Sequence, residues 1–145
     1  MDSRARGHAP GPPAGGPGRA VGQRALGYLY QQTDAAHEAE SLVRQSVEIL
    51  EGLCREAPTN RDYRHQLALS HFTLFQTLWW QRRLEEAETS GQRAIELYEG
   101  LIAGEGTGPS YAHEVCAIYQ SMGSLLANDL GRLEEAEQAY QRGIE

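Results

Sequence analysis

The sequence predicts an all-α fold of stacked antiparallel helical hairpins, and three observations lead to this prediction. The chain repeats itself: residues 83–96 and 132–145 are identical at ten of fourteen positions, at an offset of 49. Residues 39–53 match residues 87–101 at six of fifteen positions, at an offset of 48. Apolar residues recur with the 3.6-residue period of a helix, and strand-like alternation is absent. Because a lone hairpin cannot cover its own apolar face, the copies are expected to stack into a solenoid segment.

The period and the residues that interrupt it place each helix. Thr59 or Asn60 can cap one helix start, and the glycines and proline of residues 104–109 end a later helix. The short turns that make each pair antiparallel are Thr33–Asp34, Arg82–Arg83 and Gly131. About six helices are expected, at residues 20–32, 34–56, 60–82, 84–103, 110–129 and 132–145. They form three units, at about 20–56, 60–104 and 110–145.

Small residues and apolar residues predict how the helices of a pair meet. An alanine recurs at the same place in every second helix, where it lets the paired backbones approach closely: Ala39, Ala87 and Ala136. The apolar face of the helix at 84–103 is expected to bury Ala87, Ala94, Ile95, Leu97, Tyr98 and Leu101.

Residues 1–19 differ from the rest of the chain. Residues 1–20 hold four of the six prolines, five of the sixteen glycines and almost nothing apolar larger than alanine. Such a segment buries too little surface to offset the entropy of ordering it, so we expect a disordered tail rich in Gly, Pro and Arg. No apolar stretch follows its arginines, so the tail does not read as a secretory signal. Residues 20–145 form the predicted helical repeat domain.

The composition disfavours several classes of function. From Ala25 to Glu145, nine arginines oppose nineteen Asp and Glu residues, a net charge of 9 − 19 = −10, which argues against a nucleic-acid partner. All thirteen basic residues are arginine, so the lysine of a phosphate-binding loop, a Schiff-base enzyme or a kinase is missing. No run reaches the ~18–20 apolar residues of a membrane span. Cys54 and Cys116 lie far apart in the sequence, which indicates reduced thiols in a cytoplasmic protein, with a disulfide as the alternative.

The repeat resembles the tetratricopeptide repeat family, in the long-unit variety found in large bacterial signalling chains, including Ser/Thr kinases. Leu26-Gly27 and Met122-Gly123 resemble the Leu-Gly pair of the family's first helix, and Gly131 stands at its turn. The second-helix positions that match the family pattern are Ala39, Ala87, Ala94, Ala136 and Tyr140. Over about residues 20–145, the resemblance implies a right-handed solenoid that binds proteins.

The sequence departs from the family pattern in its period and at several positions. The period is 48 to 49 residues rather than 34. Phe75 stands at the first-helix glycine position, Gly91 at the aromatic position and Gly143 at the later alanine position. The third unit also carries one extra residue within 127–132. We expect these departures to change the details of the superhelix and to leave the hairpin class unchanged.

The last helix ends early relative to its counterpart. Glu145 aligns with Glu96, after which the earlier copy continues for about two more turns. No polar capping helix follows, although solenoids normally shield their last apolar face. We expect that the chain is a piece of a longer array, or that it self-associates through this end.

In the tetratricopeptide family, the first helices line a concave groove that binds peptides or partner segments. Carried over by position, the groove residues are Arg24, Tyr28 and Gln31 in the first unit, Phe72, Gln76, Trp79 and Trp80 in the second, and Gln120, Ser124 and Asn128 in the third. Tryptophan and arginine are favoured binding anchors. Trp79 and Trp80 point about 100° apart on a helix, so one can pack in the core while the other faces outward. The alternative is that both pack in the core or between hairpins.

Two other groups of residues invite a chemical interpretation. His65 and His113 are equivalent positions that suggest a metal pair, but no Cys, Asp or Glu recurs beside them at ligand spacing, which favours ordinary helix positions. The paired carboxylates Glu85–Glu86 and Glu134–Glu135 stand at helix starts, where negative charge complements the helix dipole. We therefore expect neither a metal nor a cofactor.

The sequence predicts a non-catalytic scaffold that binds a peptide or partner segment in the groove, with basic or mixed segments favoured by the acidic body. The alternative is a structural or regulatory repeat arm of a larger bacterial signalling protein such as a Ser/Thr kinase, with the catalytic part outside this chain. An enzyme would need a pocket of convergent titratable groups, and an RNA-binding repeat would need a basic groove. The sequence indicates neither.

Overall fold

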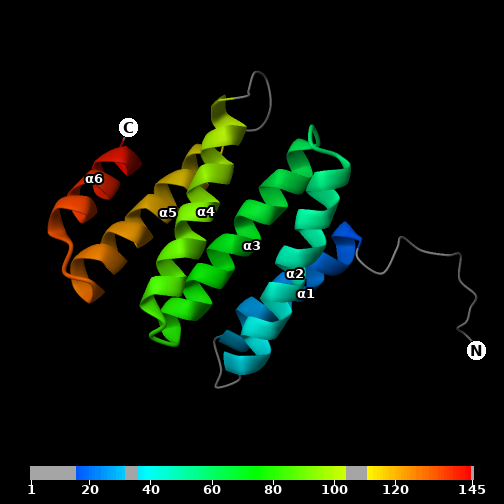
Figure 1. The fold of residues 1–145 in the computed structure, drawn as a ribbon, viewed down its shortest axis with the longest axis horizontal. Coiled ribbons are helices and arrows are strands. Elements are labelled where there is room, and N and C mark those ends of the chain that lie inside the picture. The colour runs from blue at the N-terminus through cyan, green and yellow to red at the C-terminus, as the bar shows by residue number, and fades with distance from the viewer. Residues whose placement is uncertain (1–15, 32–35, 104–110, 145) are drawn as a thin grey trace, which may run out of the picture.

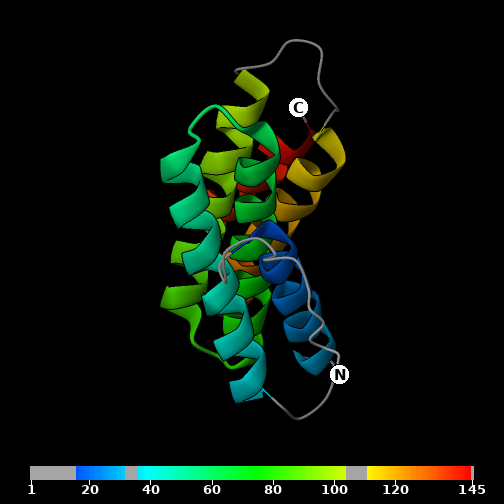
Figure 2. The same cartoon turned by 90° about the vertical axis from the view of Figure 1, so that its right-hand side faces the viewer.

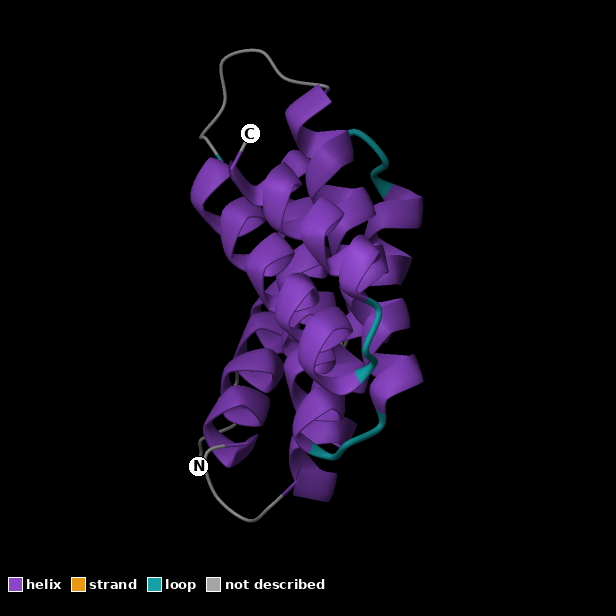
Figure 3. Ribbon diagram, turned by 90° about the vertical axis from the view of Figure 1, so that its left-hand side faces the viewer, coloured by secondary structure: helices purple, strands orange, loops and turns teal. Residues whose placement is uncertain are grey.

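The computed structural model describes residues 16–31, 36–103 and 111–144, and every regular element in these ranges is helical. The elements are α1 (Pro17–Gln31), α2 (Ala36–Glu56), α3 (Arg61–Trp80), α4 (Leu84–Ala103), α5 (Ala112–Ser124), the short π-helix η1 (Leu125–Asp129) and α6 (Leu133–Ile144). The predicted all-α fold and the six helices are confirmed. Within these ranges only short loops interrupt the helices (Figure 3).

The helices pair into three hairpins, α1–α2, α3–α4 and α5–α6, which stand side by side in a row (Figure 1). The packing is most extensive within α3–α4 and α1–α2, and α2 packs on α3, joining the first two hairpins, about as extensively as α5 packs on α6. In the view of Figure 2, α2 and α4 lie on one side of the molecule, and α1 and α5 lie on the other. The row is therefore two helices deep, as a stack of hairpins requires.

Two helix starts show how the sequence sets the boundaries. Helix α1 begins at Pro17, which suits a first helical position because its missing N–H would be unpaired there in any case. Residues 17–19, which we assigned to the tail, therefore belong to α1. Asn60 caps α3 by accepting a hydrogen bond from the backbone N–H of Tyr63 at 3.0 Å. The remaining parts of these predictions, residues 1–15, Thr33–Asp34 and 104–109, lie outside the described residues.

The turn between α3 and α4 closes with a pair of backbone hydrogen bonds typical of a Schellman motif. The N–H of Arg82 donates to the carbonyl of Trp79, and the N–H of Arg83 donates to the carbonyl of Leu78, both at 2.9 Å. Arg82 adopts a φ of 63°, a left-handed conformation that costs a residue other than glycine about 1–2 kcal/mol. At the equivalent place in the third hairpin, Gly131 has a φ of 68° without that cost.

Inside each hairpin, a glycine on one helix faces a larger side chain. The glycine is on the first helix in the first and third hairpins, and on the second helix in the second hairpin. A Cβ added at Gly27 would lie 2.5 Å from a valine methyl carbon of α2, and one at Gly123 would lie 2.8 Å from the Tyr140 ring. In the second hairpin, Phe75 is the large residue of the first helix, and a Cβ added at Gly91 would lie 3.1 Å from its ring and still closer to a methionine sulfur of α5. The two departures from the repeat pattern therefore compensate each other, which explains why the hairpin class survives them.

The predicted helix faces agree with the observed burial. The three recurring alanines, Ala39, Ala87 and Ala136, are 0, 0 and 3% exposed. Of the residues expected to be buried in α4, Leu97 alone is only partly buried, and it still packs against the core. The second helices thus meet their partners through the faces that the 3.6-residue period indicates.

The extra residue of the third unit lies at the π-helix η1. The N–H of Leu130 donates to the carbonyl of Leu125 at 3.1 Å, an i to i+5 bond of the π type. Between the second and third units, the first helices correspond at an offset of 48 and the second helices at an offset of 49, so the insertion must lie between these helices. A π turn accommodates one additional residue without ending the helix. Asp129 is the last residue of this turn.

Candidate partner-binding site

A pocket of about 580 Å³ opens between the C-terminal end of α3 and helix α5. Its lining residues are Gln76, Trp79, Trp80, Arg82 and Ser121. Both tryptophans of the chain are among them. The volume lies within the range of about 300–1,000 Å³ that is usual for ligand pockets.

Trp79 and Trp80 divide into one anchored and one exposed indole. Trp79 packs on Phe75, with 5.4 Å between the ring centroids, and is partly buried against the core. Its Nε1 donates to Oδ2 of Asp129 at 2.6 Å. Trp80 is 71% exposed. The sequence-based expectation that one indole packs inward while the other faces outward is confirmed, and the alternative that both are core residues is wrong for Trp80.

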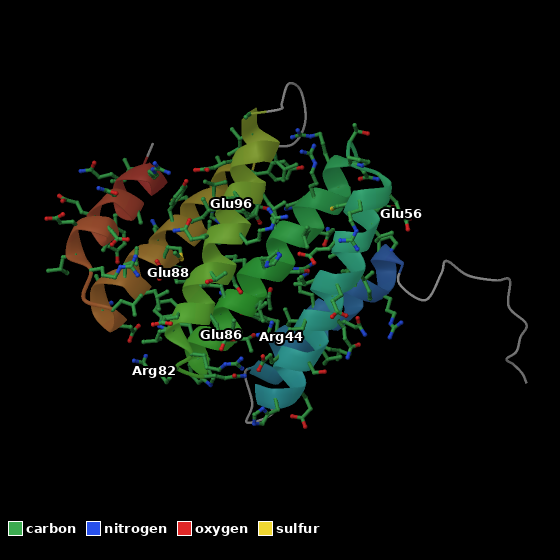
Figure 4. All side chains as sticks on the ribbon, in the orientation of Figure 1. Arg44, Glu56, Arg82, Glu86, Glu88 and Glu96 are labelled. Atoms are coloured by element: carbon green, nitrogen blue, oxygen red, sulfur yellow. The ribbon has the colours of Figure 1, made fainter. Side chains whose placement is uncertain are left out.

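The carboxylate of Asp129 on η1 binds two residues that line the pocket, Trp79 and Arg82. Its Oδ1 accepts a hydrogen bond from Nη1 of Arg82 at 2.7 Å, while its Oδ2 accepts the bond from Trp79. The Arg82 guanidinium, and to a smaller extent the Trp79 indole, hold the pKa of this carboxyl below its usual range. Asp129 therefore stays ionised, and it fixes one indole and one guanidinium at the rim. Arg82 itself points outward at the edge of the molecule (Figure 4).

The lining of the pocket combines aromatic and polar side chains. The exposed indole of Trp80 offers a flat apolar and cation-attracting surface. Gln76 and Ser121 add hydrogen-bond donors and acceptors. The five lining residues include no Cys, His, Asp or Glu that would serve as nucleophile or general base. The pocket therefore offers aromatic surface and polar groups in similar measure.

The structure places the remaining groove residues of the second and third units outside this pocket. Phe72 stacks on Phe75 at 6.0 Å and is partly buried against the core. The hydroxyl of Ser124 lies 3.1 Å from that of Tyr140, so it is engaged within its own hairpin. Gln120 and Asn128 are exposed, on α5 and η1 respectively.

The groove residues assigned to α1 form a separate region. Arg24 Nη2 donates to Oε1 of Gln66 on α3 at 3.0 Å. Burial lowers the pKa of this guanidinium, and the nearby Tyr98 hydroxyl acts in the opposite direction. Tyr28 is 50% exposed, whereas the side chain of Gln31 lies outside the described residues. None of the α1 residues lines the tryptophan pocket.

Three residues at or beside the pocket were not predicted from the sequence. The sequence does mark Arg82, because this residue occupies the turn position where the third unit has Gly131. The sequence also marks Asp129, because this residue lies in the segment that contains the extra residue of the third unit. Ser121 could not be identified from the sequence, since nothing in the repeat pattern distinguishes it from other polar positions of α5.

The histidine pair of the sequence does not stay equivalent in the structure. The His65 ring lies 4.6 Å from the Tyr111 ring, and its Nε2 is 3.4 Å from a carboxylate oxygen of Glu114. His113 is exposed. Within the described ranges, no three side chains of His, Cys, Asp or Glu come close enough together to hold a metal ion.

Fold and pocket together describe an all-α stack of hairpins with an aromatic pocket between neighbouring first helices. Neither the models of known protein families nor the curated protein sequences contain a match to this chain. Among the helices of the described residues, none combines the length and apolar character needed to cross a membrane.

Proposed function

We propose that the chain is a non-catalytic protein–protein interaction scaffold, which binds a peptide or partner segment along the first-helix groove of a tetratricopeptide-like solenoid. The observation that carries the proposal is the pocket between α3 and α5, with Trp80 71% exposed at its rim. Large exposed aromatic residues beside anchored polar groups are the usual centres of binding energy in protein interfaces. The groove assignment itself rests on the resemblance of the repeat.

The charge of the chain indicates the kind of segment that would bind. The residues from Ala25 to Glu145 carry a net charge of −10, which attracts basic or mixed segments and repels acidic ones. A lysine or arginine of the partner would find the exposed face of Trp80, where a cation–π contact contributes about 0.5–2 kcal/mol. The preferred ligand is therefore a peptide with basic side chains next to apolar ones.

The proposal also includes a bacterial source and a cytoplasmic location. The resemblance of the repeat to long-unit bacterial tetratricopeptide repeats supports a bacterial protein. Cys54 and Cys116 are both free thiols and partly buried, which fits a reducing compartment such as the cytoplasm. Burial raises the pKa of the Cys54 thiol, so this side chain is a poor nucleophile.

The position of the two tryptophans gives a direct test of the proposal. Because both tryptophans of the chain line the same pocket, tryptophan emission, excited selectively over that of the seven tyrosines, reports on this pocket. Peptides selected from a displayed library on the full chain are titrated while the emission is followed. We expect Trp80→Ala to weaken binding of the selected peptides at least about tenfold, as truncating a central aromatic anchor does.

The matched control is Leu133→Ala on α6. Leu133 is 68% exposed, close to the 71% of Trp80, so both variants should fold alike, which circular dichroism verifies. Selected peptides that bind Trp80→Ala as tightly as the original chain would contradict the proposed site. Equal weakening by both substitutions would also contradict it.

A further inference from the structure

Ion pairs between the second helices of successive hairpins follow the repeat. Arg83, just before α4, places Nη1 2.5 Å from a carboxylate oxygen of Glu40 on α2. Arg132, at the equivalent place before α6, places Nη1 2.7 Å from a carboxylate oxygen of Glu88 on α4. The same atoms of equivalent residues thus join hairpin one to hairpin two and hairpin two to hairpin three.

Each of these arginines is also held by its own helix. Nη2 of Arg83 lies 2.6 Å from Glu86, and Nη2 of Arg132 lies 2.5 Å from Glu135, three residues further along in each case. Between the first two hairpins, Arg44 of α2 adds a contact of 3.3 Å to Glu86, and Figure 4 shows these two side chains between α2 and α4. The guanidinium groups are therefore oriented before they meet the preceding hairpin.

Glu137 is the next carboxylate in this series. Glu40, Glu88 and Glu137 occupy the same repeat position, at successive offsets of 48 and 49. The side chains of Glu40 and Glu88 are only 14 and 21% exposed, because each one is covered by the arginine of the following hairpin. Glu137 is exposed and, within the described residues, has no ion-pair partner.

The apolar residues around Glu137 show the same difference. Val47 and Ile95 occupy one repeat position and are 8 and 6% exposed, whereas Ile144 at that position is 84% exposed. Leu84 packs against the core, whereas its equivalent Leu133 is 68% exposed. In Figure 1, α6 lies at the outer end of the row of helices. Its outer face thus repeats a surface that the first two hairpins bury against their neighbours.

We infer that the outer face of α6 is a docking surface for a further helical hairpin of the same repeat, whose second helix begins with an arginine that pairs with Glu137. The inference goes beyond the proposed function, which concerns the first-helix groove. Charge and shape both specify the occupant, since an acidic acceptor and an apolar position recur together at each existing junction. A second copy of this chain stacked through its first hairpin does not meet this requirement, because Ala35 stands at the arginine position there.

An extended chain tests the inference. Glu145 aligns with Glu96, so a second copy of residues 97–145 attached after Glu145 continues the repeat in register. Hydrogen exchange of the amides of residues 133–144 is measured in the original and in the extended chain. We expect the added hairpin to slow this exchange about tenfold or more, because stacked repeats stabilise their neighbours.

Substitutions separate the ion pair from general stacking. In the extended chain, Glu137→Gln should speed exchange in α6 about two- to fivefold, as expected for one partly exposed ion pair. In the original chain the same substitution should have no effect. The control is Glu134→Gln, an identical change of charge in the first turn of the same helix, whose effect on exchange comes from the helix dipole and should be the same in both chains. Combining Glu137→Arg with glutamate at the matching arginine of the added hairpin should restore the slow exchange.

Three results would overturn the inference. The first is exchange in α6 that is equally fast in the original and extended chains. The second is an effect of Glu137→Gln that is equal in the original and extended chains. The third is exchange in the original chain that slows as its concentration rises, which would make a second copy of the chain the occupant of this face.

Discussion

The second and third hairpins share much of their sequence but differ sharply in burial. Helices α4 and α6 belong to segments that are identical at ten of fourteen positions. Seven residues of α4 are buried, whereas Ala136 is the one buried residue in the described part of α6. The difference follows from position in the row, because the second hairpin stands between two others, whereas the third has a neighbouring hairpin on one side only in the described part of the chain (Figure 1). In a repeat protein, the neighbours of a residue decide its burial as much as its own type does.

The largest expected effect comes from one repeat position probed in both hairpins. Ile95→Ala should lower the free energy of unfolding by about 2–4 kcal/mol, because the side chain is 6% exposed and its removal leaves a cavity. Ile144→Ala should change it by no more than about 0.5 kcal/mol, because that side chain is 84% exposed. Urea unfolding followed by circular dichroism measures both values. Equal losses would show that the two hairpins do not differ in the way described.

An intermediate effect should appear in the pH dependence of the second hairpin. Burial, with a smaller contribution from the positive Arg93, lowers the pKa of His71 to about 4, although Glu51 lies 3.8 Å away. In the unfolded chain this imidazole has a pKa of about 6.5. Because the pKa of His71 is lower in the folded chain than in the unfolded one, the unfolded chain takes up this proton first as the pH falls. Relative to acidic conditions the fold is therefore stabilised fully above pH 6.5, and this contribution is lost as the pH falls towards 4. The loss amounts to at most about 3 kcal/mol.

His71→Leu isolates this contribution. Unfolding free energies of the original chain and the variant are compared at pH 7 and at pH 4.5. The original chain should lose more stability than the variant over this interval, because leucine binds no proton in the unfolded state. At the equivalent position of the third hairpin, Tyr119 donates a hydrogen bond to Glu99 and stays neutral throughout the interval. Identical losses in the two proteins would show that the imidazole does not titrate on unfolding.

The fold could be predicted from the sequence because it depends on repeated features. Helix boundaries follow from period and caps such as Asn60, and the alanines at the hairpin contacts recur in every unit. The start of α1 was missed because the surrounding composition suggests disorder, although Pro17 suits a first helical position. Local composition and local helix signals conflicted there, and the helix signal prevailed.

The candidate site was harder to predict because it depends on what is not repeated. Trp79 and Trp80 were found by their residue type and their helix. Arg82 and Asp129 form the rim through a turn with positive φ and a π turn, and no periodic pattern describes either feature. Phe72 was assigned to the groove by position, yet its stacking on the core could be seen only in three dimensions.

The smallest expected effect concerns the two turns. Gly131→Ala should destabilise the chain by about 1 kcal/mol, because alanine pays the cost of a left-handed conformation. Arg82→Gly should change stability by less than about 1 kcal/mol, since relief of that cost is offset by the more flexible unfolded chain and the lost pair with Asp129. Thermal unfolding of both variants is the measurement. A large loss for Arg82→Gly would mean that the ion pair contributes more than a surface pair normally does.

The π-helix η1 shows how a change of length in one repeat can alter the binding surface of its neighbour. One inserted residue turns the rest of an α-helix by about 100°, which would move α6 away from the face it packs on. Because the π turn confines this rotation to residues 125–129, the third hairpin keeps its partner helix in place. The inserted segment also supplies the carboxylate that holds Trp79 and Arg82 of the second hairpin. Insertions of this kind let a repeat array acquire new recognition residues while the second helix still packs on its hairpin partner.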